Sequence, residues 1–331
     1  MSPYSPITDD DATSKNRSQS SITRRSAIKR VGAIGLSLST LTVAGSAAAD
    51  EDDYDTITVD AGRTETITLG EGETLENLLI DCTADGAHVS IHAMESDWTI
   101  RNVGIEGRVS DTAAVLGVAD TGGGESTIEN VYIGDGADQG HRVGIGMWVH
   151  PDHDGHLDVE RVHIQEMGDN AFYASAPGTG GGGTVAFDSC YSANSWVSHF
   201  RLAEGTVENC VAVNDERHMD GRGVWAWAPG DVVVDGCDFN MNGRHYSVVS
   251  GASDTPSTVY VTDTAYTTAF HGGLNEVHGG TIVVEDEPDR EPADELPEGC
   301  PASPEEAAAG RADDDRLDGV RIQRSSELRE Y

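Results

Sequence analysis

The chain has 331 residues, 39 of them glycine, and carries 21 Lys and Arg against 58 Asp and Glu, a formal net charge of −37. Hydrophobic residues make up 37% of the sequence, which is enough for a buried core and excludes a membrane protein. A chain with this charge repels phosphate backbones, so the composition also excludes nucleic acid as a partner.

Lysine occurs only at Lys15 and Lys29, and Arg is used in place of Lys in the rest of the chain. Removing residues 1–49, which hold six basic and three acidic side chains, leaves 15 basic and 55 acidic ones. Self-repulsion at this charge is screened only when the Debye length falls to about 3 Å, as it does in molar salt. We therefore expect a halophilic protein. The recurrence of apolar and Gly positions in register argues against a disordered acidic chain.

The N-terminus indicates an export signal. Residues 23–29 read Thr-Arg-Arg-Ser-Ala-Ile-Lys, which resembles the twin-arginine motif; an apolar stretch over 31–44 and three alanines at 47–49 follow. The stretch is too short and too rich in Gly, Ser and Thr to span a membrane. We expect residues 1–49 to be a twin-arginine signal peptide, the export machinery to be a partner, and the mature chain to be extracellular; an amphipathic helix is the alternative.

A repeat of about twenty-five residues follows. Each copy joins two short apolar runs through an Asn, Gly, Asp or Ser that tolerates left-handed backbone; Arg161 is the exception. The eight copies are 75–80, 100–105, 128–133, 159–164, 187–192, 207–212, 234–239 and 261–266. A second apolar run completes each unit, at 88–92, 113–118, 144–149, 171–174, 199–202, 224–227, 246–249 and 269–271. The units have no 3.6-residue period, which excludes a helical solenoid and predicts an all-β parallel β-helix of about eight or nine coils.

Cys190, Cys210 and Cys237 occupy the same repeat position, which predicts an inward column of buried thiols about 4.8 Å apart. Cys82 and Cys300 are left over, and a disulfide between them is one way to pin the C-terminal segment. We place the β-helix at 50–284 and an acidic, Pro-rich tail or end cap at 285–331, with a short helix at 304–309.

The run 168–178, Gly-Asp-Asn-Ala-Phe-Tyr-Ala-Ser-Ala-Pro-Gly, and the Gly-rich turn after it resemble a family of exported haloarchaeal β-helix proteins related to the pectin-lyase-like fold. The resemblance covers roughly 70–285 and implies right-handed winding and archaeal origin. It implies little about chemistry, since members are mostly of unassigned function. The Trp-Ile-Asp-His run of pectate lyases and the Gly-His-Gly run of polygalacturonases, which share that fold, are absent.

The inserted loop at 150–156 is dense in imidazole and carboxylate groups. Such a loop either binds a metal or supplies acid and base groups, or it is a solvated polar turn. The candidate metal ligands are Asp152, His153, Asp154 and His156, and calcium held by Asp152, Asp154 or Asp169 is one possibility. The candidate catalytic residues are Arg222, His153 and Asp169.

Arginines and aromatic residues recur at the turns that lead into the second run of each coil. Arg pairs with carboxylates through two parallel hydrogen bonds, and aromatic rings support sugar faces; the alternative is that these arginines neutralise neighbouring acids. The candidate carbohydrate-binding residues are Arg142, Asn170, Tyr173, Trp196, His199, Arg201, Arg222, Trp225, Trp227, Arg244 and His245, with His141 and Asp169 beside them. Three hypotheses stay open: a binder of acidic polysaccharide at or near the cell surface, a polysaccharide lyase, epimerase or hydrolase on the same face, and a structural exoprotein without a ligand.

Overall fold

The computed structural model describes residues 28–29, 54–110, 113–138, 140–215, 219–227, 229–286 and 288–310. Most of the predicted signal peptide and the end of the chain from 311 onward lie outside these residues. Within the described part, no helix is long and apolar enough to cross a membrane.

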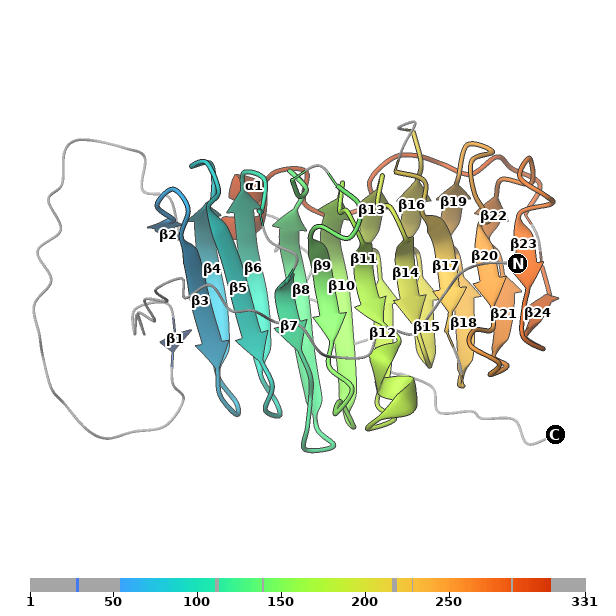
Figure 1. Ribbon diagram of the computed structural model, residues 1–331, viewed down its shortest axis with the longest axis horizontal. Coiled ribbons are helices and arrows are strands. Elements are labelled where there is room, and N and C mark those ends of the chain that lie inside the picture. Colours follow the sequence, from blue (N-terminus) through green and yellow to red (C-terminus); the bar gives the residue numbers. More distant parts are fainter. Residues whose placement is uncertain are drawn as a thin grey trace, which may run out of the picture.

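Parallel strands stacked in two sheets form the body of the protein (Figure 1). The 15-stranded sheet contains β1 (Ile28–Lys29), β2 (Asp55–Thr58), β4 (Thr74–Asp81), β6 (Thr99–Glu106), β8 (Glu125–Ile133), β10 (His156–Gln165), β12 (Thr184–Asp188), β13 (Tyr191–Ala193), β15 (Gly205–Glu208), β16 (Val211–Val213), β18 (Asp231–Asp235), β19 (Asp238–Asn240), β21 (Thr258–Thr262), β22 (Ala265–Tyr266) and β24 (Thr281–Val284). The nine-stranded sheet contains β3 (Thr64–Leu69), β5 (His88–Ala93), β7 (Ala114–Val118), β9 (Ile145–Val149), β11 (Asn170–Ala174), β14 (Ser198–Leu202), β17 (Arg222–Ala226), β20 (Val248–Ser250) and β23 (Leu274–Glu276). Each coil passes from one sheet to the other, and all strand pairs except the antiparallel pair β1–β4 are parallel, so the chain forms an all-β parallel solenoid that fits the predicted right-handed β-helix.

The predicted bends are confirmed in every repeat. The bend residues Asn77, Asn102, Asn130, Arg161, Ser189, Asn209, Gly236 and Asp263 all have φ between 43° and 63°. Asn side chains also bond to each other from coil to coil: Asn102 Nδ2 donates to Asn77 Oδ1, and Asn130 Nδ2 donates to Asn102 Oδ1, both at 2.8 Å. Even Arg161 adopts the left-handed conformation, so its place in the repeat outweighs the preference of its residue type.

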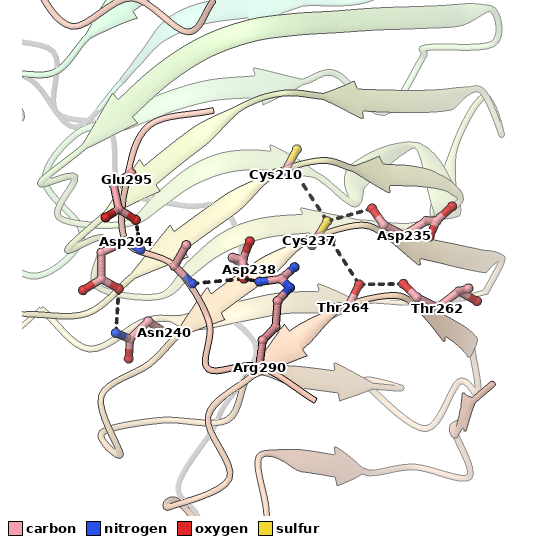
Figure 2. A network of polar contacts seen from close by, with 11 residues as sticks. Cys210, Asp235, Cys237, Asp238, Asn240, Thr262, Thr264, Arg290, Asp294 and Glu295 are labelled. Atoms are coloured by element: carbon pink, nitrogen blue, oxygen red, sulfur yellow. Dashed lines mark hydrogen bonds and ion pairs between the residues drawn. The ribbon is translucent and has the colours of Figure 1, made fainter. Parts of the chain in front are cut away.

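The residue after each bend points into the core. Cys190, Cys210 and Cys237 are fully buried there, as predicted. The Cys190 N–H donates to the Cys210 thiol at 3.3 Å, and the Cys210 N–H donates to the Cys237 thiol at 3.4 Å. Figure 2 shows the end of this column, where Thr264 takes the next position and accepts from the Cys237 N–H at 3.2 Å.

Seven of the eight predicted second runs overlap strands of the nine-stranded sheet. The prediction at 269–271 is wrong, because that segment is a turn, and β23 forms at Leu274–Glu276 instead. Gly272 and Gly273 have φ of 83° and 80°, so the chain reverses there before it re-enters the sheet. β3 adds a strand ahead of the first predicted second run.

The described C-terminal segment 288–310, here called the strap, runs back along the outside of the solenoid toward the early coils (Figure 1). Its helix α1 (Pro304–Ala308) packs against β4, β6 and β8. Ser303 caps that helix by accepting from the Glu306 N–H at 3.1 Å, which confirms the predicted short helix. Over this length the segment therefore packs against the outside of the 15-stranded sheet.

Polar contacts hold the strap to the later coils. Arg290 pairs with Asp238 of β19, the Ala293 N–H donates to the same carboxylate at 3.0 Å, and Asn240 donates to Asp294 at 2.6 Å (Figure 2). Farther along, α1 sits where a Cβ on Gly104 would overlap the Pro304 carbonyl. A disulfide plays no part: Cys82 and Cys300 are free thiols, so the suggested pairing is wrong.

Candidate functional site

His153 lies inside the loop at 150–156 and is fully buried. Its Nδ1 accepts from the Asp120 N–H at 3.0 Å, and its Nε2 donates to the Thr184 carbonyl at 3.0 Å. Both ring nitrogens therefore fasten the loop to neighbouring coils. With these two contacts in place, His153 has no free lone pair for a metal ion or a substrate proton.

The other three candidate ligands of that loop do not converge. Asp152 is 77% exposed, Asp154 accepts from the Gly123 N–H at 3.1 Å, and His156 contacts Thr184 and Asp158. Among the residues that the structure describes, no group of three or more His, Cys, Asp and Glu side chains is arranged to hold a metal ion. Calcium at this loop stays a prediction without a pre-formed ligand set.

Two of the candidate arginines are paired with acids, as the neutralisation alternative expected. Arg142 Nη1 lies 3.0 and 2.8 Å from the two oxygens of Asp169, and Asn170 Nδ2 also donates to Asp169 at 2.6 Å. Arg244 pairs with Asp220. These contacts commit the Asp169 carboxylate, which is 9% exposed, to an ion pair rather than to a free catalytic role.

His199 belongs to the interior and not to a binding surface. Its Nδ1 lies 2.8 Å from the Ser192 hydroxyl and its Nε2 lies 2.9 Å from Asn214 Oδ1. Since Asn214 donates its amide to the Gly221 carbonyl, its Oδ1 accepts from His199. Burial lowers the pKa of His199 to about 4, so the ring is neutral near pH 7.

A row of outward side chains crosses four consecutive strands of the nine-stranded sheet. Backbone register aligns Trp148 of β9 with Tyr173 of β11, Tyr173 with Arg201 of β14, and Arg201 with Trp225 of β17. At a strand spacing of about 4.8 Å, this row extends roughly 14 Å along the solenoid axis. We call these four residues the open column.

Arg201 is the centre of the open column. Its guanidinium carbon lies 4.3 Å from the ring centre of Tyr173, 5.1 Å from that of Trp225 and 3.6 Å from that of Trp227. The residue is 5% exposed, and its Nε has no hydrogen-bond partner. Burial lowers the pKa of Arg201 to about 10, so it stays charged near neutral pH.

Arg222 and His245 flank the open column. The Arg222 guanidinium lies 4.0 Å from the Trp225 ring centre, and its Nη1 donates to the Val197 carbonyl at 2.9 Å. His245 accepts at Nδ1 from the Tyr246 N–H at 2.8 Å; burial and then the charge of Arg222 lower its pKa to about 4. His245 is therefore neutral near pH 7 with its proton on Nε2, where it can donate to a ligand.

The structure thus brings together Tyr173, Arg201, Arg222, Trp225 and Trp227, while Trp196 packs against His141 at 5.0 Å. Trp148 was missed as a site residue although it lies within the predicted run 144–149. Its alignment with Tyr173 depends on the lengths of the loops between coils, which the repeat pattern alone does not fix. Comparison of the chain with protein-family models, with curated proteins and with solved structures finds no match.

Proposed function

We propose that this protein binds acidic polysaccharide through the open column and the arginines beside it. The observation that carries the proposal is Arg201, a buried cation held among three aromatic rings with its Nε unbonded. Partly exposed aromatic rings at Trp148, Tyr173 and Trp225 supply flat apolar faces on which sugar rings stack. Arg201 and Arg222 supply positive charge on a chain that is otherwise strongly acidic.

Binding is favoured over catalysis by how the nearby proton-transfer groups are used. A general base needs a free lone pair within reach of the substrate proton. His199 is interior, Asp169 is paired with Arg142, and the Nδ1 lone pair of His245 is occupied by the Tyr246 N–H. Each of these candidates is therefore committed to a contact within the fold.

A lyase, epimerase or hydrolase acting on the same face is the second candidate function. The observation that favours it is the neutral His245 beside the Arg222 cation, since such a pair could donate a proton and stabilise negative charge on a sugar. A structural exoprotein without a ligand is the third.

A panel of uronate-rich, sulfated and neutral polysaccharides in molar salt separates these functions. Retention on immobilised acidic glycan without product, weakened by Trp225→Ala, supports binding. Unsaturated products, C5-inverted uronate residues or new reducing ends, abolished by Arg222→Ala, would establish the enzyme instead. Neither retention nor product across the panel would leave the structural role.

Halophily and export belong to the same proposal. Excess negative charge predicts that the melting temperature falls when salt is lowered from molar to tenths of molar, since the repulsion is then unscreened. Equal stability at both salts would contradict halophily.

Export through the twin-arginine route is tested separately. Arg24→Lys with Arg25→Lys is expected to retain the precursor in the cytoplasm, and continued secretion of this double variant would contradict that route.

A further inference from the structure

Among the described residues, Arg201 forms no salt bridge with an acidic side chain. Six others pair with carboxylates: Arg101, Arg108, Arg142, Arg161, Arg244 and Arg290. Asp169 is close enough to raise the pKa of Arg201, yet its oxygens bond with Arg142 and Asn170. A buried cation without an anion is costly, so stability alone does not account for this arrangement.

The rings around Arg201 form a slot. Tyr173 lies on the preceding coil, whereas Trp225 and Trp227 belong to the following coil, and the guanidinium lies between them. Aromatic rings therefore cover the guanidinium from both directions along the axis. We infer that an anion meets the guanidinium at its edge, where the unbonded Nε lies.

The shape of this slot selects among anions. A carboxylate is planar, and its two oxygens match two parallel N–H groups of a guanidinium edge. A sulfate ester is tetrahedral, so when two of its oxygens face the edge, its remaining oxygens project out of the plane toward the rings. We therefore expect the slot to favour the first shape over the second.

The recessed position also suits molar salt. Attraction between exposed charges is screened within about 3 Å under those conditions, while a partly buried pair is screened much less. A guanidinium that is 5% exposed can therefore contribute to anion binding where a surface arginine contributes little.

We propose that the Arg201 slot binds one carboxylate group of a uronate residue edge-on and discriminates against sulfate esters. This inference rests on the proposed polysaccharide-binding function and specifies the anion that the open column selects. The neighbouring Arg222, stacked on Trp225, contacts an adjacent part of the same glycan chain.

The test compares three oligosaccharides by calorimetry in molar salt: an oligogalacturonate, its methyl ester, and a sulfated dextran oligosaccharide of matched charge. The folded protein is expected to bind the oligogalacturonate at least about tenfold more tightly than either of the others. Arg201→Lys keeps the charge and removes the planar fork, so it should weaken oligogalacturonate binding by about tenfold. Arg101→Lys, which alters an arginine paired with Glu76 on the 15-stranded sheet, is the matched control and should leave affinity unchanged.

The melting temperature of every variant is measured to confirm that it folds. Equal affinity for the uronate and sulfated ligands, or unchanged uronate binding by Arg201→Lys, overturns the slot while leaving the proposed function in place. No binding of either acidic ligand by the unmutated protein overturns both.

Discussion

Two outward columns run along this solenoid, and each places a basic group between aromatic rings. On the 15-stranded sheet, His163 of β10 is aligned with Tyr132 of β8 and Tyr191 of β13, with ring centres 4.8 Å away on each side. The strap covers this column, and the His163 Nδ1 donates to the Pro301 carbonyl at 2.8 Å. On the nine-stranded sheet, the open column has the same plan around Arg201, whereas the strap contacts described above all lie on the other sheet.

The two columns differ in whether the central basic side chain finds a hydrogen-bond partner within the protein. His163 obtains a main-chain acceptor from the strap, and Tyr132 is 7% exposed beneath it. Arg201 obtains rings on both sides and leaves its Nε unbonded. The covered column therefore contributes to stability, whereas the open column is where we propose that a ligand binds.

Placing a charge in the interior beneath both columns should lower the free energy of unfolding the most. Cys210→Asp places an unpaired charge in a fully buried column, so we expect a loss of about 4 kcal/mol or more in the free energy of unfolding. Denaturant unfolding in molar salt measures this. Cys210→Ala is the matched control and should cost far less; an unchanged midpoint for Cys210→Asp would contradict the inward column.

Acidification should destabilise the core behind the open column through His199. In the unfolded chain this histidine takes up a proton below about pH 6.5, whereas the folded chain resists until about pH 4. Its contribution is therefore complete above pH 6.5 and declines by roughly 3 kcal/mol as the pH falls toward 4. His199→Gln should flatten the stability profile in this window, while His278→Gln, at an exposed site, should not. Equal slopes for both variants would contradict this role.

Displacing the strap should affect only the covered side. Gly104→Ala drives a methyl group into the Pro304 carbonyl, so we expect a loss of about 1–3 kcal/mol and faster proteolysis of the strap. Gly117→Ala is the matched control on the nine-stranded sheet, where the nearest atom to the new Cβ is His92 Nδ1 at 3.4 Å. That variant should change stability by less than about 0.5 kcal/mol. Equal effects would show that α1 is not firmly seated.

Replacing His163 and Arg201, the central side chains of the two columns, should have small and unequal effects on the free energy of unfolding. His163→Leu leaves the Pro301 carbonyl buried and unpaired, a cost of about 1–3 kcal/mol. Arg201→Met keeps apolar packing against the rings and removes a buried charge, so its stability should change by less than about 1 kcal/mol. Binding of acidic glycan should show the reverse ranking. A large loss of stability in Arg201→Met would instead make Arg201 a structural residue.

Much of the solenoid could be predicted from the sequence because stacking repeats one local geometry. The left-handed bends favour Asn, Gly, Asp or Ser, and the residue after each bend must be small or apolar to fit in the core. The shared repeat position of Cys190, Cys210 and Cys237 therefore predicted their inward column. The strap could not be predicted in this way. Its contacts, such as Arg290 with Asp238, join segments far apart in sequence and follow no period.

The candidate site was predictable in composition but not in detail. Arginine and tryptophan at successive coils pointed to the nine-stranded sheet, yet the pattern did not distinguish side chains that turn outward from those that turn inward. His199 and Arg201 are two residues apart in β14, and one is an interior hydrogen-bonding group while the other is stacked among outward rings. His153 illustrates the same limit, since main-chain partners on two other coils decide its role.

Tryptophan fluorescence gives the most direct test of the open column. Of the five tryptophans, Trp98 is fully buried, and Trp148, Trp196, Trp225 and Trp227 are partly exposed and belong to or flank strands of the nine-stranded sheet. Quenching by acrylamide therefore reports this face and not the covered one. Saturation with acidic oligosaccharide in molar salt should lower the quenching constant of the unmutated protein, and Arg201→Met should abolish the change. Calorimetric binding with unaltered quenching would contradict the account, because the ligand would then lie away from the open column.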